Sequence, residues 1–173
     1  IPLLAGLLRS LPHAERRRLA RVLAAAFALR LLLSILFDTI PSTRIFHEDT
    51  YTYENTGRLI AASWAHEAPP VNLGNTDPNS PYPGFLMFCA SLFYVFGRFR
   101  LVITAFTSLA GTVTVFMVYR LTSRMFHSIV AYRAALLAAF FPSMALWSAM
   151  ALKDPIMIML ITIALDSLIA LRR

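Results

Sequence analysis

The feature that most constrains this chain is a series of apolar runs long enough to cross a bilayer. A helix needs roughly 20 residues to cross about 30 Å of hydrocarbon. Four runs are close to that length, and we expect each to span the membrane: residues 19–37, 101–119, 129–150 and 155–171. With 58% hydrophobic and 14% charged residues, the chain has too little polar surface for an ordinary soluble domain. The sequence therefore predicts an all-α, polytopic transmembrane helical bundle with about four spans.

A fifth apolar segment, residues 83–96, is shorter than a span, because as a helix it would reach only about 21 Å. The basic residues indicate where it lies. If the segment stays on one side, ten basic residues are cytoplasmic and five are outside, whereas a crossing changes the count to eight against seven. The positive-inside rule favours the first arrangement. We therefore expect a juxtamembrane helix on the outer face, a second short interfacial helix at residues 53–64, and both ends of the chain in the cytoplasm.

The domain organisation follows from this topology. Residues 1–18 combine a short apolar stretch with four arginines, which is typical of a cytoplasmic amphipathic segment. The rest, residues 19–173, is expected to form one transmembrane module with its large outer loop at 38–100. The net charge of +7 is interpreted as an orientation signal, since no basic stripe with interleaved aromatics indicates nucleic-acid binding. The chain opens on Ile1 and stops at Arg173 directly after an apolar run, so we expect it to be a fragment of a longer protein.

Carboxylates gather in the predicted outer loop, where six of the nine acidic residues fall between positions 38 and 77. Glu48 and Asp49 lie in a polar stretch, residues 46–57, which we expect to be a loop. The predicted topology places Asp154 on the same outer side. Two acidic sites more than a hundred residues apart in sequence would then share one water–lipid boundary. A carboxylate there can act on an acceptor from water while a donor stays anchored in lipid.

An ordered set of short motifs resembles a known family. In chain order the motifs are Glu48-Asp49 with Tyr53, Ser80-Pro81-Tyr82-Pro83, Phe96-Gly97, Arg100-Leu101, Arg124-Met125-Phe126, Phe141-Pro142 and Lys153-Asp154-Pro155. The set is similar to the N-terminal module of the GT-C glycosyltransferases, particularly the protein O-mannosyltransferase and aminoarabinose transferase group. The resemblance covers most of residues 19–171. It implies an integral-membrane enzyme, in the bacterial plasma membrane, that moves a sugar from a polyprenyl-phosphate donor to a protein, lipid or glycan acceptor on the outer face, with inversion.

The resemblance also assigns catalytic roles. It maps the catalytic carboxylate to Asp49, with Glu48 as the alternative, and a second outer carboxylate to Asp154. Without it, an acidic pair in a polar loop is more often solvated than catalytic, and Asp154 could simply favour the start of a helix. A divalent ion is a candidate cofactor, and His47 is a weak candidate ligand because one histidine without placed partners is little evidence for a metal.

Donor binding is less well defined by the motifs. The family often has a Lys or His before the double proline of the turn, where it contacts the donor phosphate, and Ser80 holds that place here. The resemblance therefore leaves Arg100 or Lys153 as the candidate cation. Tyr53 and Tyr82 are candidates for substrate contact, although a tyrosine at this depth also suits an interfacial anchor.

Other classes of membrane protein stay open at this point. A non-catalytic assembly subunit would not need the acidic loop, and a lipid-linked polysaccharide polymerase would share substrates and location with a transferase. A transporter should place charged or broken helices near the midplane in matched halves, and only Arg30 fits that pattern. Because an arginine at mid-membrane costs about 2.5 to 3.5 kcal/mol in lipid, Arg30 is expected to face the bundle interior. Asp166, near Arg172, is expected to be structural.

Overall fold

The structure is a computed structural model that describes residues 13–39, 48–71 and 83–171. These residues form helices and short connections, without a strand in any of the three ranges. The helices are α2 (His13–Thr39), α3 (Glu48–Trp64), α4 (Pro83–Phe96), α5 (Arg100–Met125), α6 (Ser128–Phe140), α7 (Pro142–Ser148) and α8 (Asp154–Leu171). The all-α prediction is therefore confirmed.

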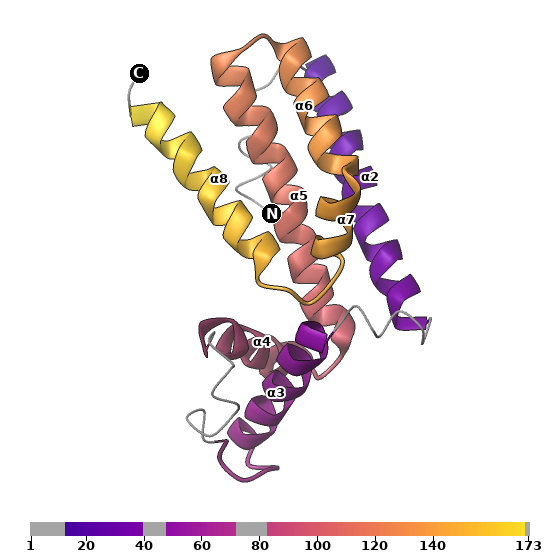
Figure 1. Cartoon of the computed structure of the whole chain (residues 1–173), viewed down its shortest axis with the longest axis vertical. Coiled ribbons are helices and arrows are strands. Elements are labelled where there is room, and N and C mark those ends of the chain that lie inside the picture. The colour runs from indigo at the N-terminus through magenta and orange to yellow at the C-terminus, as the bar shows by residue number, and fades with distance from the viewer. Residues whose placement is uncertain (1–12, 40–47, 72–82, 172–173) are drawn as a thin grey trace.

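The helices divide into an elongated bundle and a crosswise pair. In Figure 1, α2, α5, α6, α7 and α8 make up the bundle, while α3 and α4 lie across one end of it. By length and apolar character, α2, α5 and α8 can each cross a membrane, and the bent pair α6–α7 would make a fourth span. The prediction of about four spans is confirmed, and residues 83–96 form an apolar helix that is shorter than these spans. We call the end that carries α3 and α4 the α3–α4 end.

The centre of the bundle is α5, which packs against α2, α6 and α8. Its buried Val115 and Phe116 meet Leu19 and Ala26 of α2. The facing side of α6 consists of small residues: Ala131, Ala135, Ala138 and Ala139. Small side chains let membrane helices approach closely, and dispersion contacts then supply much of the packing energy. This packing fixes three of the spans around one axis.

The crosswise pair has its own apolar contacts. Tyr53 and Ile60 of α3 pack against Leu86 of α4, and the two helices approach so closely that a Cβ at Gly57 would lie 2.9 Å from the Cβ of Cys89. Burial, the largest effect, raises the pKa of the Cys89 thiol to about 12. A loop was expected at residues 46–57, but α3 already begins at Glu48. The helix expected at residues 53–64 is present, but it begins five residues earlier, so the loop expectation was wrong for residues 48–52. Burying Tyr53 outweighs the weak helix propensity of its neighbours.

Two residues of the link between α7 and α8 join the crosswise pair to the bundle. Ala151 is fully buried in a cluster with Cys89 and Phe93 of α4 and with Ile103 of α5. Leu152 packs against the neighbouring cluster that contains Tyr53. The chain segment just before Lys153 and Asp154 is thus held against α3 and α4.

Candidate functional site

The structure brings the elements that carry the two predicted acidic sites to the same end of the bundle. Asp49 lies in the first turn of α3 and is exposed, whereas Asp154 is the first residue of α8 and is half-buried. Both helices begin at the α3–α4 end (Figure 1). Leu152, two residues before Asp154, packs on the cluster of Tyr53, four residues after Asp49. The physical link between the two elements is therefore a short apolar contact.

The other predicted site residues are placed as follows. Glu48 is the first residue of α3, and Lys153 is half-buried directly before α8. Tyr53 is buried, with its ring edge-on to Phe85 at a centroid distance of 5.0 Å. His47 and Tyr82 lie outside the described residues. Within residues 13–39, 48–71 and 83–171, no group of three or more His, Cys, Asp or Glu side chains is placed to hold a metal ion.

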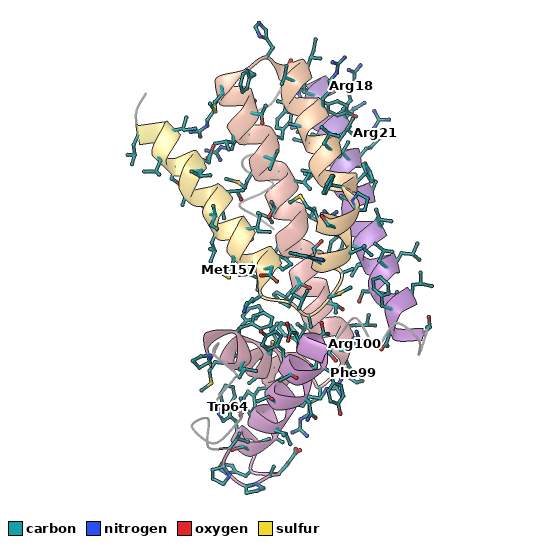
Figure 2. All side chains as sticks on the ribbon, in the orientation of Figure 1. Arg18, Arg21, Trp64, Phe99, Arg100 and Met157 are labelled. Atoms are coloured by element: carbon teal, nitrogen blue, oxygen red, sulfur yellow. The ribbon has the colours of Figure 1, made fainter. Side chains whose placement is uncertain are left out.

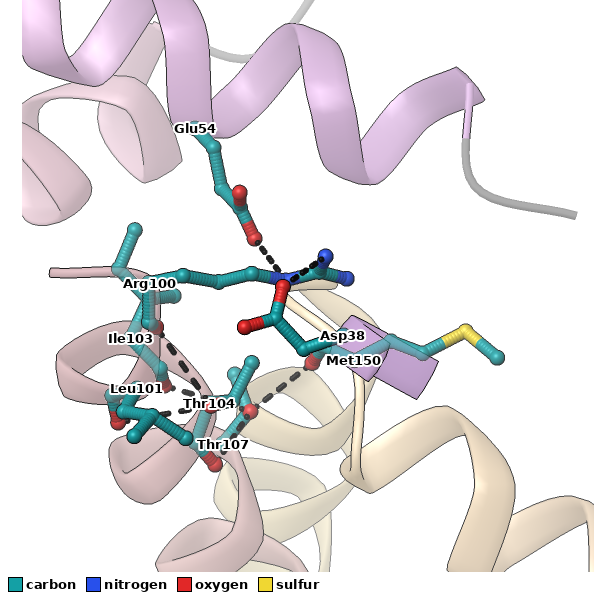
Figure 3. A network of polar contacts seen from close by, with 8 residues as sticks. All are labelled: Asp38, Glu54, Arg100, Leu101, Ile103, Thr104, Thr107 and Met150. Atoms are coloured by element: carbon teal, nitrogen blue, oxygen red, sulfur yellow. Dashed lines mark hydrogen bonds and ion pairs between the residues drawn. The ribbon is translucent and has the colours of Figure 1, made fainter. Parts of the chain in front are cut away.

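Arg100, the candidate phosphate cation, connects three helices at the α3–α4 end. Its Nη1 lies 3.1 Å from Oδ1 of Asp38, at the end of α2, and its Nε lies 3.0 Å from Oε1 of Glu54, on α3. Figure 3 shows Arg100 between these two carboxylates, next to the hydrogen bond from the Thr107 hydroxyl to the Met150 carbonyl. A phosphate that bound Arg100 would have to compete with carboxylates already paired with it.

Glu54 is a residue that the sequence did not single out. Burial raises the pKa of the Glu54 carboxyl. The positive charges of Arg100 and Arg58 lower this pKa, but they do not cancel the effect of burial, and the negative charge of Asp38 raises it further. Burial therefore favours the neutral form of this carboxyl more than solvent would. The sequence pattern that could have singled out Glu54 is its helical spacing, because Thr50, Glu54 and Arg58 are four residues apart and share one face of α3.

This face of α3 has unmet hydrogen-bonding capacity. Of the five buried side-chain polar atoms without a hydrogen-bond partner in the described chain, three lie on this face: Thr50 Oγ1, Glu54 Oε1 and Arg58 Nε. A fourth, Arg100 Nε, lies opposite Glu54 at the start of α5. Glu54 and Arg100 pair by charge, although their contact lacks hydrogen-bond geometry. The Arg58 guanidinium also lies over the Phe93 ring, 5.5 Å from its centroid. Buried polar atoms usually have partners, so this stripe is where water, ligand or another part of the chain is needed.

A buried arginine in the bundle holds the broken span in shape. Pro142 has no N–H, so the Ala138 carbonyl loses its helical donor where α6 and α7 meet at a bend of 56°. Arg30 is fully buried there, as expected, and donates to the Ala138 carbonyl at 3.5 Å and to the Ala139 carbonyl at 3.1 Å. Its Nε donates to the Ser148 hydroxyl at 2.7 Å. Arg30 therefore satisfies backbone groups at the bend that lipid could not.

The C-terminal end of α7 is fixed from α5 in the same way. The Thr107 hydroxyl donates to the Met150 carbonyl at 2.9 Å, and the Ser108 hydroxyl donates to the Ser148 carbonyl at 3.2 Å. The helices are so close that a Cβ at Gly111 would lie 2.6 Å from the Cβ of Ser148. A cavity of about 120 Å³ lies beside this contact and is lined by both Arg30 and Asp154. The start of α8 is thus positioned by polar contacts made inside the bundle.

The opposite end of the bundle carries a second polar cluster. Both carboxylate oxygens of the buried Asp166 pair at 3.1 Å, one with Arg120 and the other with Arg124. Arg124 also donates to the Asp166 carbonyl at 3.0 Å. The sequence suggested Arg172 as the neighbour, but that residue lies outside the described ranges. These contacts fasten α8 to α5 far from the predicted acidic sites.

A comparison with known protein families gives one match. Residues 79–171, more than half of the chain, match the family model described as dolichyl-phosphate-mannose-protein mannosyltransferase. No curated protein and no solved structure matches the chain. The matched range contains Arg100, Lys153 and Asp154, whereas Asp49 and Glu54 precede it.

Proposed function

Because the chain belongs to the dolichyl-phosphate-mannose-protein mannosyltransferase family, we propose that it transfers a sugar from a polyprenyl-phosphate donor to an acceptor hydroxyl at the α3–α4 end. Membership identifies a membrane glycosyltransferase of the GT-C class. The sugar, the acceptor (protein, lipid or glycan) and the side of the membrane are part of the proposal. The arginine distribution supports an outer-face reaction, and the bacterial plasma membrane is part of the proposal.

One observation carries this proposal. Leu152, beside Lys153 and Asp154, packs on the cluster formed by Tyr53 and Ile60 of α3 with Leu86 and Ala90 of α4, so the chain just before α8 lies against the helix pair that carries Glu48 and Asp49. The apolar spans place this junction at one end of the bundle, where a lipid-anchored donor and a water-borne acceptor can both arrive. A transferase with such substrates needs its acidic residues at that boundary.

The proposed chemistry assigns a step to each carboxylate. Asp49, exposed to water, accepts the proton of the acceptor hydroxyl while the hydroxyl oxygen bonds to the anomeric carbon of the sugar. The bond from that carbon to the phosphate oxygen breaks, and polyprenyl phosphate leaves. Glu48 is the alternative base. Asp154 orients the acceptor or contributes to a divalent-ion site, for which His47 remains a candidate ligand.

A cation must stabilise the leaving phosphate. The two candidates are Lys153, which adjoins Asp154 at the junction, and Arg100, which pairs with Asp38 and Glu54. Tyr53 and Tyr82 remain candidates for substrate contact. In Tyr53 the hydroxyl group is the part suited to substrate contact, because the ring packs on Phe85.

The test is sugar transfer by membranes containing the full-length protein and a labelled polyprenyl-phosphate sugar. Asp49→Asn should lower the transfer rate at least 100-fold, as expected for loss of a general base, with membrane insertion unchanged. Glu67→Gln is the matched control, because Glu67 is an exposed carboxylate just beyond α3 that pairs with Arg98. Full activity of Asp49→Asn together with loss in Glu48→Gln would move the base to Glu48. Full activity of both variants would exclude both carboxylates as the base, and equal transfer by membranes that lack the protein would favour a non-catalytic assembly subunit.

Sidedness has a separate test. Single cysteines at positions 79 and 122 should react with membrane-impermeant reagent from opposite sides, the first from outside and the second from the cytoplasm. Labelling of both from the same side would contradict the proposed topology.

A further inference from the structure

A groove between α2 and α6 lies at the end of the bundle opposite α3 and α4. Two hollows make it up, of about 190 Å³ and about 480 Å³, and both are lined by Arg18 and Tyr132. The smaller also contacts Arg133 and Glu15, and the larger also contacts Arg21. Figure 2 shows Arg18 and Arg21 at this end of α2, beside α6. Because Arg18 and Tyr132 border both hollows, the two adjoin, and we call them together the groove.

The lining changes from charged to apolar along the groove. Arg18, Arg21 and Arg133 lie toward the end of the bundle, and the deeper lining is apolar. That apolar part comprises Val22, Ala25, Leu136 and Phe140. Because α2 and α6 both run inward from this end, a rise of 1.5 Å per residue puts Phe140 about 12 Å deeper than Tyr132. A basic mouth over an apolar channel of this depth complements a phosphate group with a hydrocarbon chain attached.

The arginines at the charged end of the groove, Arg18, Arg21 and Arg133, carry positive charge that is not fully neutralised by the lining. Arg120 and Arg124 at the same end are paired with Asp166, but Arg18 and Arg133 form no ion pair within the described residues. The one carboxylate in the lining, Glu15, accepts a hydrogen bond from the Tyr119 hydroxyl at 3.2 Å. Three arginines against one glutamate leave the lining with an excess of positive charge.

We propose that this groove binds one anionic phospholipid, with its phosphate at Arg18 and Arg133 and an acyl chain between α2 and α6. Basic pockets between spanning helices recognise anionic headgroups, and each basic residue near an anionic leaflet contributes about fivefold in affinity. The site is separate from the junction of α3 and α8 and does not depend on the proposed transferase reaction.

The experiment is native mass spectrometry of the full-length protein released from nanodiscs of phosphatidylglycerol or of phosphatidylcholine. One phosphatidylglycerol should stay bound, and Arg18→Gln should lower its retention about fivefold. Arg17→Gln is the matched control, since it removes the same charge from the adjacent exposed position, which does not line the groove. Ala25→Phe should also release the lipid by filling the channel, while Ala24→Phe should not.

Four results would overturn the proposal. They are equal loss in Arg17→Gln and Arg18→Gln, equal retention of phosphatidylcholine, displacement of the lipid by millimolar inorganic phosphate, or unchanged retention in Ala25→Phe. The last would mean that another segment of protein occupies the groove. Thermal unfolding of each variant in detergent separates lipid loss from misfolding.

Discussion

Arg30 and Ser148, 118 residues apart, are joined by a 2.7 Å hydrogen bond inside the bundle. The same guanidinium donates to the carbonyls of Ala138 and Ala139, which the proline break leaves without helical donors. The Arg30 side chain, whose charge would be costly in lipid, therefore supplies hydrogen bonds to backbone carbonyls at the break between α6 and α7. It also helps to position α8, because Ser148 is only six residues before Asp154.

Arg30→Met should destabilise the bundle. Three interhelical hydrogen bonds are lost, at about 0.6 kcal/mol each, so the free energy of unfolding should fall by about 2 kcal/mol. Arg30→Lys should be intermediate, since an ammonium cannot reproduce the planar fork. Unfolding by titration with a denaturing detergent measures the effect. Arg98→Met, which removes an exposed ion pair, is the control and should cost less than about 1 kcal/mol. An Arg30→Met protein as stable as the wild type would contradict the capping role.

Gly111→Ala should separate α5 from α7. The new Cβ would lie 2.6 Å from the Ser148 Cβ and 3.0 Å from the Arg30 Nε, so packing must shift at a cost of about 1 to 3 kcal/mol. Gly84→Ala is the matched control, because nothing lies within 4 Å of its added Cβ. Thermal unfolding in detergent should show a lower midpoint for the first variant and no decrease for the second. Equal midpoints would mean that α7 can move away freely.

Asp166→Asn should loosen α8 at the end opposite the proposed reaction site. The change leaves Arg120 and Arg124 partly buried without their common carboxylate, and we expect a loss of about 2 to 3 kcal/mol. Asp38→Asn, at a carboxylate half exposed to solvent, should cost less than about 1 kcal/mol. Hydrogen exchange of α8 amides would locate the effect, and equal exchange in the two variants would refute it.

Glu54 should make stability depend on pH. Because burial raises its pKa in the folded protein, the native state holds this proton more tightly than the unfolded chain. The resulting stabilisation is complete below the ordinary value of 4.5 and is lost as pH rises through the folded pKa. Relative to Glu54→Gln, the wild type should therefore lose stability as the pH rises above 4.5.

Unfolding midpoints at several pH values measure this difference, with Glu67→Gln as the exposed-carboxylate control. The opposite slope would show that attraction to Arg100 and Arg58 outweighs burial. The groups that face Glu54 and enter this balance are Arg100, Arg58 and Asp38.

The spans could be predicted because the length and hydropathy of a run are properties of one contiguous stretch of sequence. Residues 101–119 and 155–171 lie within α5 and α8, and Pro142 marks the break in the span expected at 129–150. The helix that contains the first expected span is longer than the span, since α2 starts at His13 and runs without interruption past Leu19. Its arginine-rich first turns continue the helix into the headgroup region, where long cationic side chains are favourable.

The tertiary partners could not be predicted in the same way. Arg30 was expected to face inward, but nothing local indicates that its partners are Ser148 and the carbonyls beside Pro142. Glu54 was missed because its burial depends on how α3 lies against the start of α5. Counting arginines predicts that Asp49 and Asp154 lie on one side of the membrane, whereas the packing of Leu152 on the Tyr53 cluster could not be predicted from the sequence.

The packing of Cys89 under Gly57 has a practical consequence. The only cysteine in the sequence is sealed between α3 and α4, and its high pKa keeps it as the unreactive thiol at neutral pH. Introduced cysteines can therefore be labelled in the native protein without first removing it. Separation of α3 from α4 would expose this thiol, so the rate at which Cys89 is alkylated would report on separation of the two helices.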